Sequence, residues 1–133
     1  MDKQPFNIGD AAARSGVSAK MVRHYEGLGL VPNVGRTEAG YRQYAMKDVH
    51  TLRFIRRARD LGFSMGEIAE LLKLWQNKGR ASVDVKRIAL SHVADLHRRI
   101  EEMAAMKRTL EQLAECCQGN QRPDCPILDE LSE

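Results

Sequence analysis

Two cysteines near the C-terminal end of the chain are the residues best suited to chemistry. Cys117 and Cys125 enclose a short segment of polar and turn-forming residues, and Pro126 follows the second cysteine. Such a segment can fold back and bring both sulfur atoms to one point. Two thiolates without a histidine close by in sequence suit a soft metal ion, monovalent copper above all. The sequence therefore predicts a metal site with Cys117 and Cys125 as its ligands.

The cysteine count bears on the state of these thiols. The chain has 133 residues and three cysteines, which do not make a disulfide framework. Thiols stay reduced in the cytosol, so free thiols or metal ligands are the better interpretation. No apolar run is long enough to span a membrane, and the first residues lack the core of a signal peptide. We expect a cytoplasmic protein that has no membrane partner.

The basic residues are concentrated in the N-terminal part of the chain. Residues 1–80 contain 14 lysines and arginines against 8 acidic residues, a net charge of +6, whereas residues 81–133 have a net charge of −3. A basic surface attracts a polyanion and an acidic surface repels it. The N-terminal part is therefore the candidate for nucleic-acid binding.

Two short helices joined by a tight turn predict a helix-turn-helix. The first begins near Ile8 and ends at Gly16. The second runs from Ala19 to about Glu26, with Ser18 as its N-cap and Gly27 as its stop. Long hydrogen-bond donors spaced three apart share one helical face, which suits insertion into a DNA groove. The second helix carries Lys20, Arg23, His24 and Tyr25.

A β-hairpin, or wing, is predicted after the second helix. A turn former, Gly40, precedes a short run of β-prone residues. Arginine and tyrosine side chains in such a wing suit contacts with phosphate and sugar groups. For the two tyrosines of the wing and for Tyr25, ordinary packing is the alternative role. For the two arginines of the wing, a structural role is the less favoured alternative. The wing residues concerned are Arg36, Tyr41, Arg42 and Tyr44.

Two further helices complete the N-terminal part. The third is expected from about Met46 to Leu61, closed by Gly62, with an exposed basic face. The pattern Ser64-Met-Gly-Glu67 is a capping box that opens a fourth helix. Its Trp75 is more typical of a packing residue than of a binding residue. The basic face of the third helix consists of Arg53, Arg56, Arg57 and Arg59.

One long helix, from about Ser82 to Glu115, follows a linker at residues 77–81. Nine positions from Val85 to Leu113 alternate at spacings of four and three, and seven of them are apolar, which predicts a coiled-coil seam. A lone helix cannot bury such a seam, so we infer a homodimer with antiparallel or parallel helices. His92 in the seam is more typical of a tolerated interface residue than of a ligand.

The chain resembles the MerR family of bacterial regulators. The resemblance rests on the segment IGDAAARSGVSAKMVRHYE from Ile8 to Glu26, on Gly29-Leu30, and on the wing pattern Arg36-x3-Gly40-Tyr41-Arg42-x-Tyr44. The Cys117-x7-Cys125-Pro126 loop and the segment Arg80-Ala-Ser-Val-Asp-Val-Lys86 resemble the copper-efflux branch of that family. The resemblance covers about residues 6–131.

The resemblance implies a mechanism. Members of the family are dimers, joined by a long antiparallel coiled coil, that bind a pseudo-palindromic promoter whose spacer is too long for efficient contact by RNA polymerase. Metal binding changes the angle between the heads, and the protein then kinks and underwinds the DNA. The resemblance assigns DNA contacts to Lys20, Arg23, Tyr25, Arg36, Tyr41 and Arg42, and metal ligands to Cys117 and Cys125.

Ser82 bears on the identity of the metal. The resemblance implies that divalent-metal sensors of the family carry a cysteine at this place, supplied by the partner subunit. Two thiolates alone favour a low-coordinate ion, Cu(I), Ag(I) or Au(I), whereas a third thiolate favours divalent ions. Hg(II) also sits linearly between two thiolates and stays an alternative. If Cys116 binds, a sensor of divalent Zn, Pb, Cd or Hg gains support. Ser82 also suits a helix N-cap.

Other classes of protein compete with a metal-responsive regulator. A copper carrier needs the cysteine pair but not a basic head. A thiol enzyme needs a base near its cysteine, and no such Cys/His pairing is evident, so we expect no enzymatic activity. A redox-sensing regulator is the less favoured alternative, because Cys117 and Cys125 could also form a disulfide.

The predicted fold class is mainly all-α. A winged helix-turn-helix head with a small β-hairpin wing is expected at residues 6–76, a linker at 77–81, a dimerisation helix at 82–115, and a metal-binding loop with a short terminal helix at 116–133. The expected partners are double-stranded promoter DNA, RNA polymerase at the promoter and a second copy of the chain.

Overall fold

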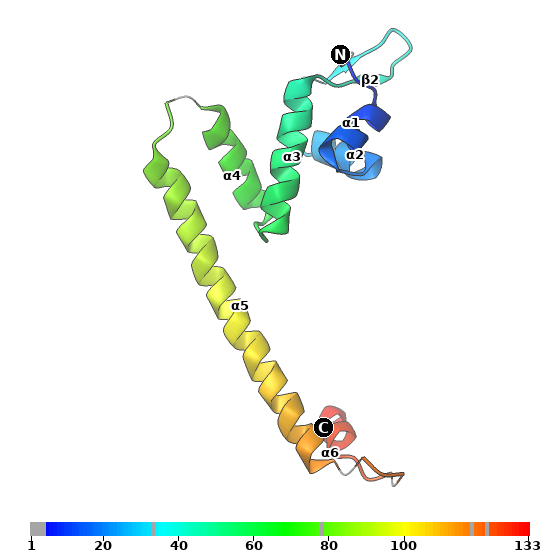
Figure 1. Ribbon diagram of the computed structural model, residues 1–133, viewed down its shortest axis with the longest axis vertical. Coiled ribbons are helices and arrows are strands. Elements are labelled where there is room, and N and C mark those ends of the chain that lie inside the picture. The colour runs from blue at the N-terminus through cyan, green and yellow to red at the C-terminus, as the bar shows by residue number, and fades with distance from the viewer. Residues whose placement is uncertain (1–4, 33, 78, 118, 122) are drawn as a thin grey trace. The chain divides into compact units, whose positions relative to one another are not determined.

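The chain is mainly helical, with one small hairpin, which confirms the predicted fold class (Figure 1). The computed structural model describes residues 5–32, 34–77, 79–117, 119–121 and 123–133. Contacts divide the chain into two units, residues 1–88 and residues 89–133. In chain order, the described elements are α1 (Ile8–Ser15), α2 (Ala19–Gly27), β1 (Gly35–Arg36), β2 (Arg42–Gln43), α3 (Met46–Asp60), α4 (Met65–Gln76), α5 (Ser82–Cys116) and α6 (Pro126–Ser132).

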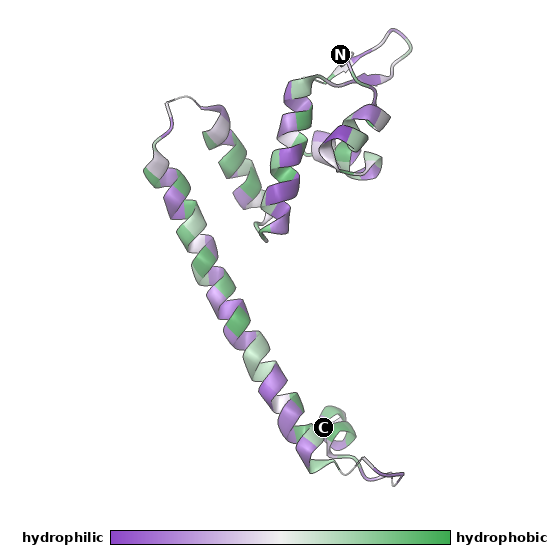
Figure 2. Ribbon diagram, viewed as in Figure 1, coloured by the Kyte–Doolittle hydropathy of each residue, from purple (hydrophilic) through white to green (hydrophobic). Residues whose placement is uncertain are grey.

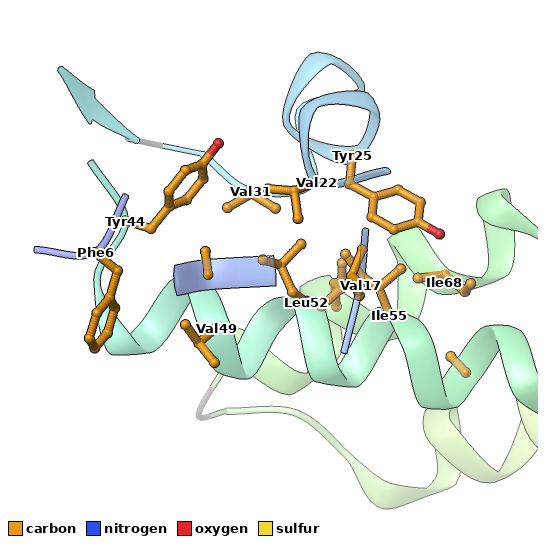
Figure 3. Close-up of a cluster of buried hydrophobic side chains, with 13 residues drawn as sticks. Phe6, Val17, Val22, Tyr25, Val31, Tyr44, Val49, Leu52, Ile55 and Ile68 are labelled. Carbon is orange, nitrogen blue, oxygen red and sulfur yellow. The ribbon is translucent and has the colours of Figure 1, made fainter. Parts of the chain in front are cut away.

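The first unit is built around one apolar cluster. Helix α3 packs against α1 and α4, and α1 also packs against α2. Leu52 and Ile55 on α3 and Ile68 on α4 are fully buried in this cluster. Figure 3 shows Leu52 beside Val22 of α2 and Val31 of the segment that leads to the wing, and Ile55 and Ile68 on the side of Tyr25. Burial of this apolar surface, at about 25 cal/mol per Å², is what holds such short helices together.

The turn between α1 and α2 has the local chemistry of a helix-turn-helix. Gly16 ends α1 with φ 77°, a left-handed conformation, and a Cβ at this position would overlap the guanidinium group of Arg56. The buried Ser15 hydroxyl accepts a hydrogen bond from the Val17 amide at 3.2 Å. The Ser18 side chain accepts from the Met21 amide at 3.2 Å, so the predicted N-cap of α2 is confirmed.

The wing is a two-stranded antiparallel hairpin. Gly35 pairs with Gln43, and Arg36 pairs with Arg42. Phe6 extends the pairing, because its backbone N–H and C=O both bond to Tyr44, at 2.6 and 2.8 Å. The N-terminal end of the first unit is thereby joined to the second strand of the wing.

The helix ends follow the predicted signals, with small differences. The capping box of α4 is confirmed, since Ser64 and Glu67 exchange two hydrogen bonds at 2.8 and 3.2 Å. Helix α3 ends at Asp60, one residue before the predicted end. Gly27 was predicted to stop α2 but is its last helical residue. The reversal comes two residues later, where Gly29 takes the left-handed φ of 79°.

Helix α5 is 35 residues long and keeps most of its apolar residues exposed. Figure 2 shows hydrophobic and hydrophilic residues alternating along it, without a continuous apolar segment. In the part of the chain that the structure describes, no helix is both long and apolar enough to cross a membrane. The predicted coiled coil stays a prediction. Apolar residues with more than half of their surface exposed on α5 include Val93, Ile100, Met103, Met106 and Leu110.

Replacing a buried leucine of α3 should destabilise the first unit far more than replacing an exposed one. Leu52 is fully buried and Leu61, just after α3, is 66% exposed. Leu52→Ala should lower the free energy of unfolding by about 2–5 kcal/mol, because it removes apolar contacts and leaves a cavity. Leu61→Ala should change it by less than about 0.5 kcal/mol. Urea denaturation followed by circular dichroism measures both, and equal losses would contradict the core described above.

Candidate functional site

Helix α2 presents a polar face opposite its buried face. Val22 is fully buried and Tyr25 is 5% exposed, so these two residues fix which side of α2 faces the core. Lys20 and Arg23 lie three residues apart on the opposite side, and both are exposed. The structure therefore brings Lys20 and Arg23 together on one face, as the sequence predicted.

The wing carries the other predicted DNA-binding residues. Tyr41 is 74% exposed at the base of a tight turn, in which Thr37 and Tyr41 exchange hydrogen bonds at 2.8 and 3.0 Å. Arg36 donates to the Gly40 carbonyl at 3.1 Å and is exposed. Arg42 is partly buried on β2. An exposed aromatic ring flanked by arginines is the arrangement expected for contacts with phosphate and sugar groups.

A hollow lies between α2 and the wing. Its volume is about 440 Å³, and it brings Arg23 of α2 beside Arg42 of β2. Two guanidinium groups at the wall of an open hollow attract an anion of the size of a phosphate group. Its lining residues are Asn7, Ile8, Arg23, Gly40, Tyr41 and Arg42.

Two tyrosines of the predicted interface belong to the core instead. Tyr44, proposed for phosphate or sugar contacts, is fully buried, and that prediction is wrong. Tyr25 is buried in the same cluster, so its ring packs against apolar residues, and any contact with DNA would be limited to its edge (Figure 3). Packing was the stated alternative for both residues. Trp75, predicted to pack, stacks on Phe54 with ring centroids 4.7 Å apart.

An acidic residue that the sequence did not single out joins α2 to the wing. Glu26 accepts a hydrogen bond from Arg42 Nε at 2.5 Å and one from the Tyr44 hydroxyl at 3.2 Å. Burial is the largest cause that raises the pKa of Tyr44 to about 12, and the charge of Glu26 and its hydrogen bond add to the effect. Arg42 and Arg23 oppose this increase. Tyr44 is therefore a neutral donor at physiological pH.

The three cysteines lie around the end of α5 and the start of α6. Cys116 is the last residue of α5 and is exposed, whereas Cys117 and Cys125 are partly buried. Cys117 continues the helical hydrogen bonding, because its amide donates to the Leu113 carbonyl at 3.1 Å. Cys125 occupies the N-cap position of α6, and its carbonyl accepts from the Asp129 amide at 3.0 Å. All three are free thiols, and the two predicted ligands flank one loop.

The donor set around these thiols fits a soft metal ion. Within the described residues, no group of three or more histidine, cysteine or carboxylate side chains is placed to hold a metal. Two thiols at the ends of one loop offer sulfur ligands only, which soft ions prefer. Residues 118 and 122, inside the loop, lie outside the described residues.

Ser82 begins α5 and is exposed. Ala81 precedes it, and the Asp84 amide donates to the Ala81 carbonyl at 3.1 Å. The first helical position is therefore Ser82, and the cap position suggested as its alternative role belongs to Ala81. A side chain at the first turn of the helix remains accessible to another chain.

Two family models match the chain across the elements described above. The model of the MerR HTH family regulatory proteins matches residues 6–75, and the model described as MerR, DNA binding, matches residues 49–113. The chain belongs to the MerR family. This is a family of regulatory proteins with a helix-turn-helix, so the resemblance seen in the sequence is confirmed.

Relatives of this MerR-family chain match almost its whole length. The heavy metal-dependent transcription regulator 2 of Rhizobium meliloti (strain 1021) is 56% identical over 96% of this chain and 86% of its own length. The HTH-type transcriptional regulator CueR of Salmonella typhimurium is 43% identical over 96% of this chain and 92% of its own. The crystal structure of the transcription regulator PbrR691 of Ralstonia metallidurans CH34, in complex with lead(II), is 29% identical, has a TM-score of 0.83, and covers 95% of this chain and 98% of that chain.

Two structural features of this MerR-family chain were missed by sequence reasoning. Asn7 caps α1, since its side chain accepts from the Asp10 amide at 2.8 Å, and an asparagine just before an apolar helix was a usable signal. The bond between Glu26 and Arg42 joins residues 16 positions apart, and no local pattern indicates it.

Proposed function

We propose that this chain is a metal-responsive transcriptional regulator that binds promoter DNA as a homodimer and activates transcription when monovalent copper, or silver or gold, binds Cys117 and Cys125. The observation that carries the proposal is the placement of the thiols. Cys117 and Cys125 flank one loop and are partly buried, while Cys116 is exposed on the last turn of α5. Heavy-metal dependence in the name of a relative at 56% identity supports the same class of function.

The choice of a monovalent ion rests on the number of sulfur donors. Cys117 and Cys125 supply two thiolates, and Ser82 supplies only a hydroxyl group. A two-coordinate site suits Cu(I), Ag(I) and Au(I), whereas a third thiolate favours divalent ions. The resemblance of the Cys117–Cys125 loop to the copper-efflux branch of the family agrees with copper. The likeness to PbrR691, solved with lead(II), supports the second candidate, a divalent-metal sensor in which Cys116 contributes.

We assign DNA binding to α2 and the wing. In this proposal, the exposed Lys20 and Arg23 contact base edges in the major groove, where an arginine can bind guanine with two hydrogen bonds. Tyr41, Arg36 and Arg42 on the wing contact the DNA backbone, and the exposure of Tyr41 and Arg36 supports this assignment. Tyr25 contributes by fixing the orientation of α2 from within the core. The head at residues 6–76 would thus act as one DNA-binding unit.

We propose that α5 forms a coiled coil with a second copy. The exposed Met103, Met106 and Leu110 follow the spacing of the predicted seam, and the exposed Val93 and Ile100 widen it. An apolar stripe of this kind costs free energy unless another surface covers it. Two heads joined in this way match a promoter with two half-sites. A metal ion shifts such a dimer between two states only if it binds one state more tightly. Distortion of the promoter DNA, which then favours contact with RNA polymerase, is the change we assign to the metal-bound state.

Removal of either proposed ligand should abolish the metal response. Cys117→Ser and Cys125→Ser each leave one thiolate, which cannot hold a two-coordinate ion. Anaerobic transcription from a promoter selected for binding to the wild-type chain should then show no activation by Cu(I), while DNA affinity stays within about twofold of wild type because the head is separate in sequence.

Cys116→Ser is the matched control. The exposed side chain of Cys116 should be dispensable, so this variant should keep the Cu(I) response. An unaltered response in Cys117→Ser or Cys125→Ser would refute the ligand assignment. Complete loss in Cys116→Ser would favour the divalent-metal sensor. Activation by peroxide without metal would favour the redox-sensing regulator.

Arg42 and Arg23 should differ in how their loss changes DNA binding. Arg42→Ala should weaken binding to all sequences alike and reduce the slope of log affinity against log salt by about one, because one phosphate contact is lost. Arg23→Ala should cost about 1–3 kcal/mol on the preferred sequence and less elsewhere. Fluorescence anisotropy over a salt series measures both effects. A wild-type salt slope in Arg42→Ala would remove the wing from the interface.

A thiol at position 82 should broaden the metal response. If Ser82 faces the partner's loop in the dimer, Ser82→Cys adds a third sulfur donor and should confer activation by divalent ions such as Hg(II) or Zn(II). If the residue only begins α5, the substitution should leave the ranking of metals unchanged and change the free energy of unfolding by less than about 0.5 kcal/mol. Transcription with Cu, Ag, Hg, Zn and Pb, with a thermal melt of each protein, separates these outcomes.

A further inference from the structure

Glu26 lies at the junction of the recognition helix and the wing. Its side chain is 17% exposed, and its Oε2 atom accepts both the Arg42 Nε bond and the Tyr44 hydroxyl bond. Its Oε1 atom lies 3.9 Å from an Nη2 atom of Arg36. One carboxylate on the last turn of α2 is therefore bound by three side chains from or beside the two strands of the wing.

We propose that Glu26 is a positioning residue for DNA binding, a carboxylate clamp that fixes the wing against α2 and sets the direction of the Arg42 guanidinium group. The inference rests on the proposed DNA-binding role of the wing. It adds a residue that itself need not touch DNA and that acts through Arg42.

The geometry of a guanidinium group explains how the clamp works. Arginine has five N–H donors in one plane, one on Nε and four on the two Nη atoms. The Glu26 carboxylate engages the Nε donor, and this fixes the plane of the group. The Nη donors then remain for another acceptor. Because Arg42 and Arg23 line the same hollow, an acceptor there would meet both guanidinium groups.

Tyr44 gives the clamp a rigid anchor. Its ring is fully buried and its backbone pairs with Phe6 through two hydrogen bonds, so its hydroxyl has little freedom to move. A donor held in this way fixes the carboxylate from the core side while Arg42 binds it from the wing side. Burial, together with the charge and hydrogen bond of Glu26, keeps the pKa of Tyr44 at about 12, and Arg42 and Arg23 act in the opposite direction.

A positioning role and a purely electrostatic role predict opposite results. A negative charge beside a DNA phosphate is repulsive, so removing it should tighten binding to any DNA if only charge matters. If Glu26 positions Arg42, removing it should weaken binding to the preferred sequence even though the head becomes more basic. The sign of the change is therefore the test.

The experiment uses the full chain and two DNA duplexes. One is selected from random sequence for binding to the wild-type chain, and the other is a scrambled duplex of the same composition. Glu26→Asp keeps the charge but is one methylene shorter, and Glu26→Gln keeps the length but removes the charge. Both variants should lose about tenfold in affinity for the selected duplex, as expected for charge-assisted hydrogen bonds, and less than about twofold for the scrambled one.

Glu38→Gln is the matched control for charge. Glu38 is exposed in the turn of the same wing, and its removal changes the net charge by the same amount. It should tighten binding to both duplexes slightly and equally. The same small tightening in Glu26→Gln, or wild-type binding in Glu26→Asp, would overturn the positioning role.

Titration of Tyr44 without DNA tests the contact itself. Near-ultraviolet absorbance of wild type and of Tyr44→Phe identifies the Tyr44 step, and Glu26→Gln should move that step below about pH 12. An unmoved step would overturn the clamp. If Glu26→Gln lowers the pKa of Tyr44 but leaves DNA binding unchanged, the contact exists but does not position Arg42 for DNA, and the proposal is also overturned.

Two further results separate this inference from the proposed function. If Arg42→Ala binds both duplexes as wild type does, the wing role fails, whatever Tyr44 shows. If Glu26→Gln fails to fold in a thermal melt, Tyr44→Phe supplies the test, since it removes only one hydroxyl from the clamp. That variant should lose about threefold in the ratio of selected to scrambled affinity, and an unchanged ratio would count against the clamp.

Discussion

Burial of one face of α2 is the constraint on which the rest of the DNA-binding head depends. A helix of nine residues is not stable alone in water, and its Ser18 cap adds only about 1 kcal/mol. Its conformation is therefore held by Val22 and Tyr25 in the shared apolar cluster. Because helical residues three apart lie on one side, burying these two residues forces Lys20 and Arg23 outward. The outward face is thus set from within the core.

The wing, unlike α2, has no buried face large enough to hold it, since a hairpin of two residues per strand has almost no core of its own. Strand pairing with Phe6 and the buried ring of Tyr44 supply what the hairpin lacks. Glu26, an acidic residue beside the arginines of the wing, lowers the attraction of the wing for DNA, but in our proposal it also fixes the direction of the Arg42 guanidinium group. Affinity for any polyanion increases with positive charge, whereas selectivity for one sequence requires side chains held in fixed directions. Glu26 therefore affects these two properties in opposite ways.

Signals confined to a few neighbouring residues were enough to predict most of the fold. Ser18, Ser64 and Gly16 marked helix ends because caps and left-handed turns depend on adjacent backbone groups. The prediction that Gly27 stops α2 was wrong, because a glycine is also permitted inside the last turn of a helix. The chain reverses at Gly29 instead. Helical periodicity is also a local signal, and Leu52 and Ile55, three residues apart on α3, are both fully buried.

The side-chain roles were harder to predict, because they depend on contacts between distant segments. Tyr41 and Tyr44 are three residues apart, so an extended chain places them on opposite sides. The sequence could have indicated that only one is exposed, but not which one. The choice follows from pairing with Phe6, some 38 positions earlier in the chain. The bond of Glu26 to Arg42 depends on the same folding of the wing. The ligand role of Cys117 and Cys125 stays a prediction, argued from their residue type and from their places at the two ends of one loop.

The length of α5 limits how a metal ion can act on DNA. A helix of 35 residues spans about 50 Å, whereas charges in physiological salt are screened over about 8–10 Å. A metal ion beyond Cys116 therefore cannot act through its charge on residues at the Ser82 end of the same α5. The signal must pass mechanically along α5 or through a second copy.

Antiparallel pairing of two α5 helices would bring the Ser82 end of one beside the Cys116 end of the other. In that arrangement Ser82, the proposed selectivity residue, would lie beside the partner's metal loop and next to the head of its own chain, where a small change in coordination could alter the orientation of that head. A role for Ser82 in metal selectivity therefore requires the proposed dimer.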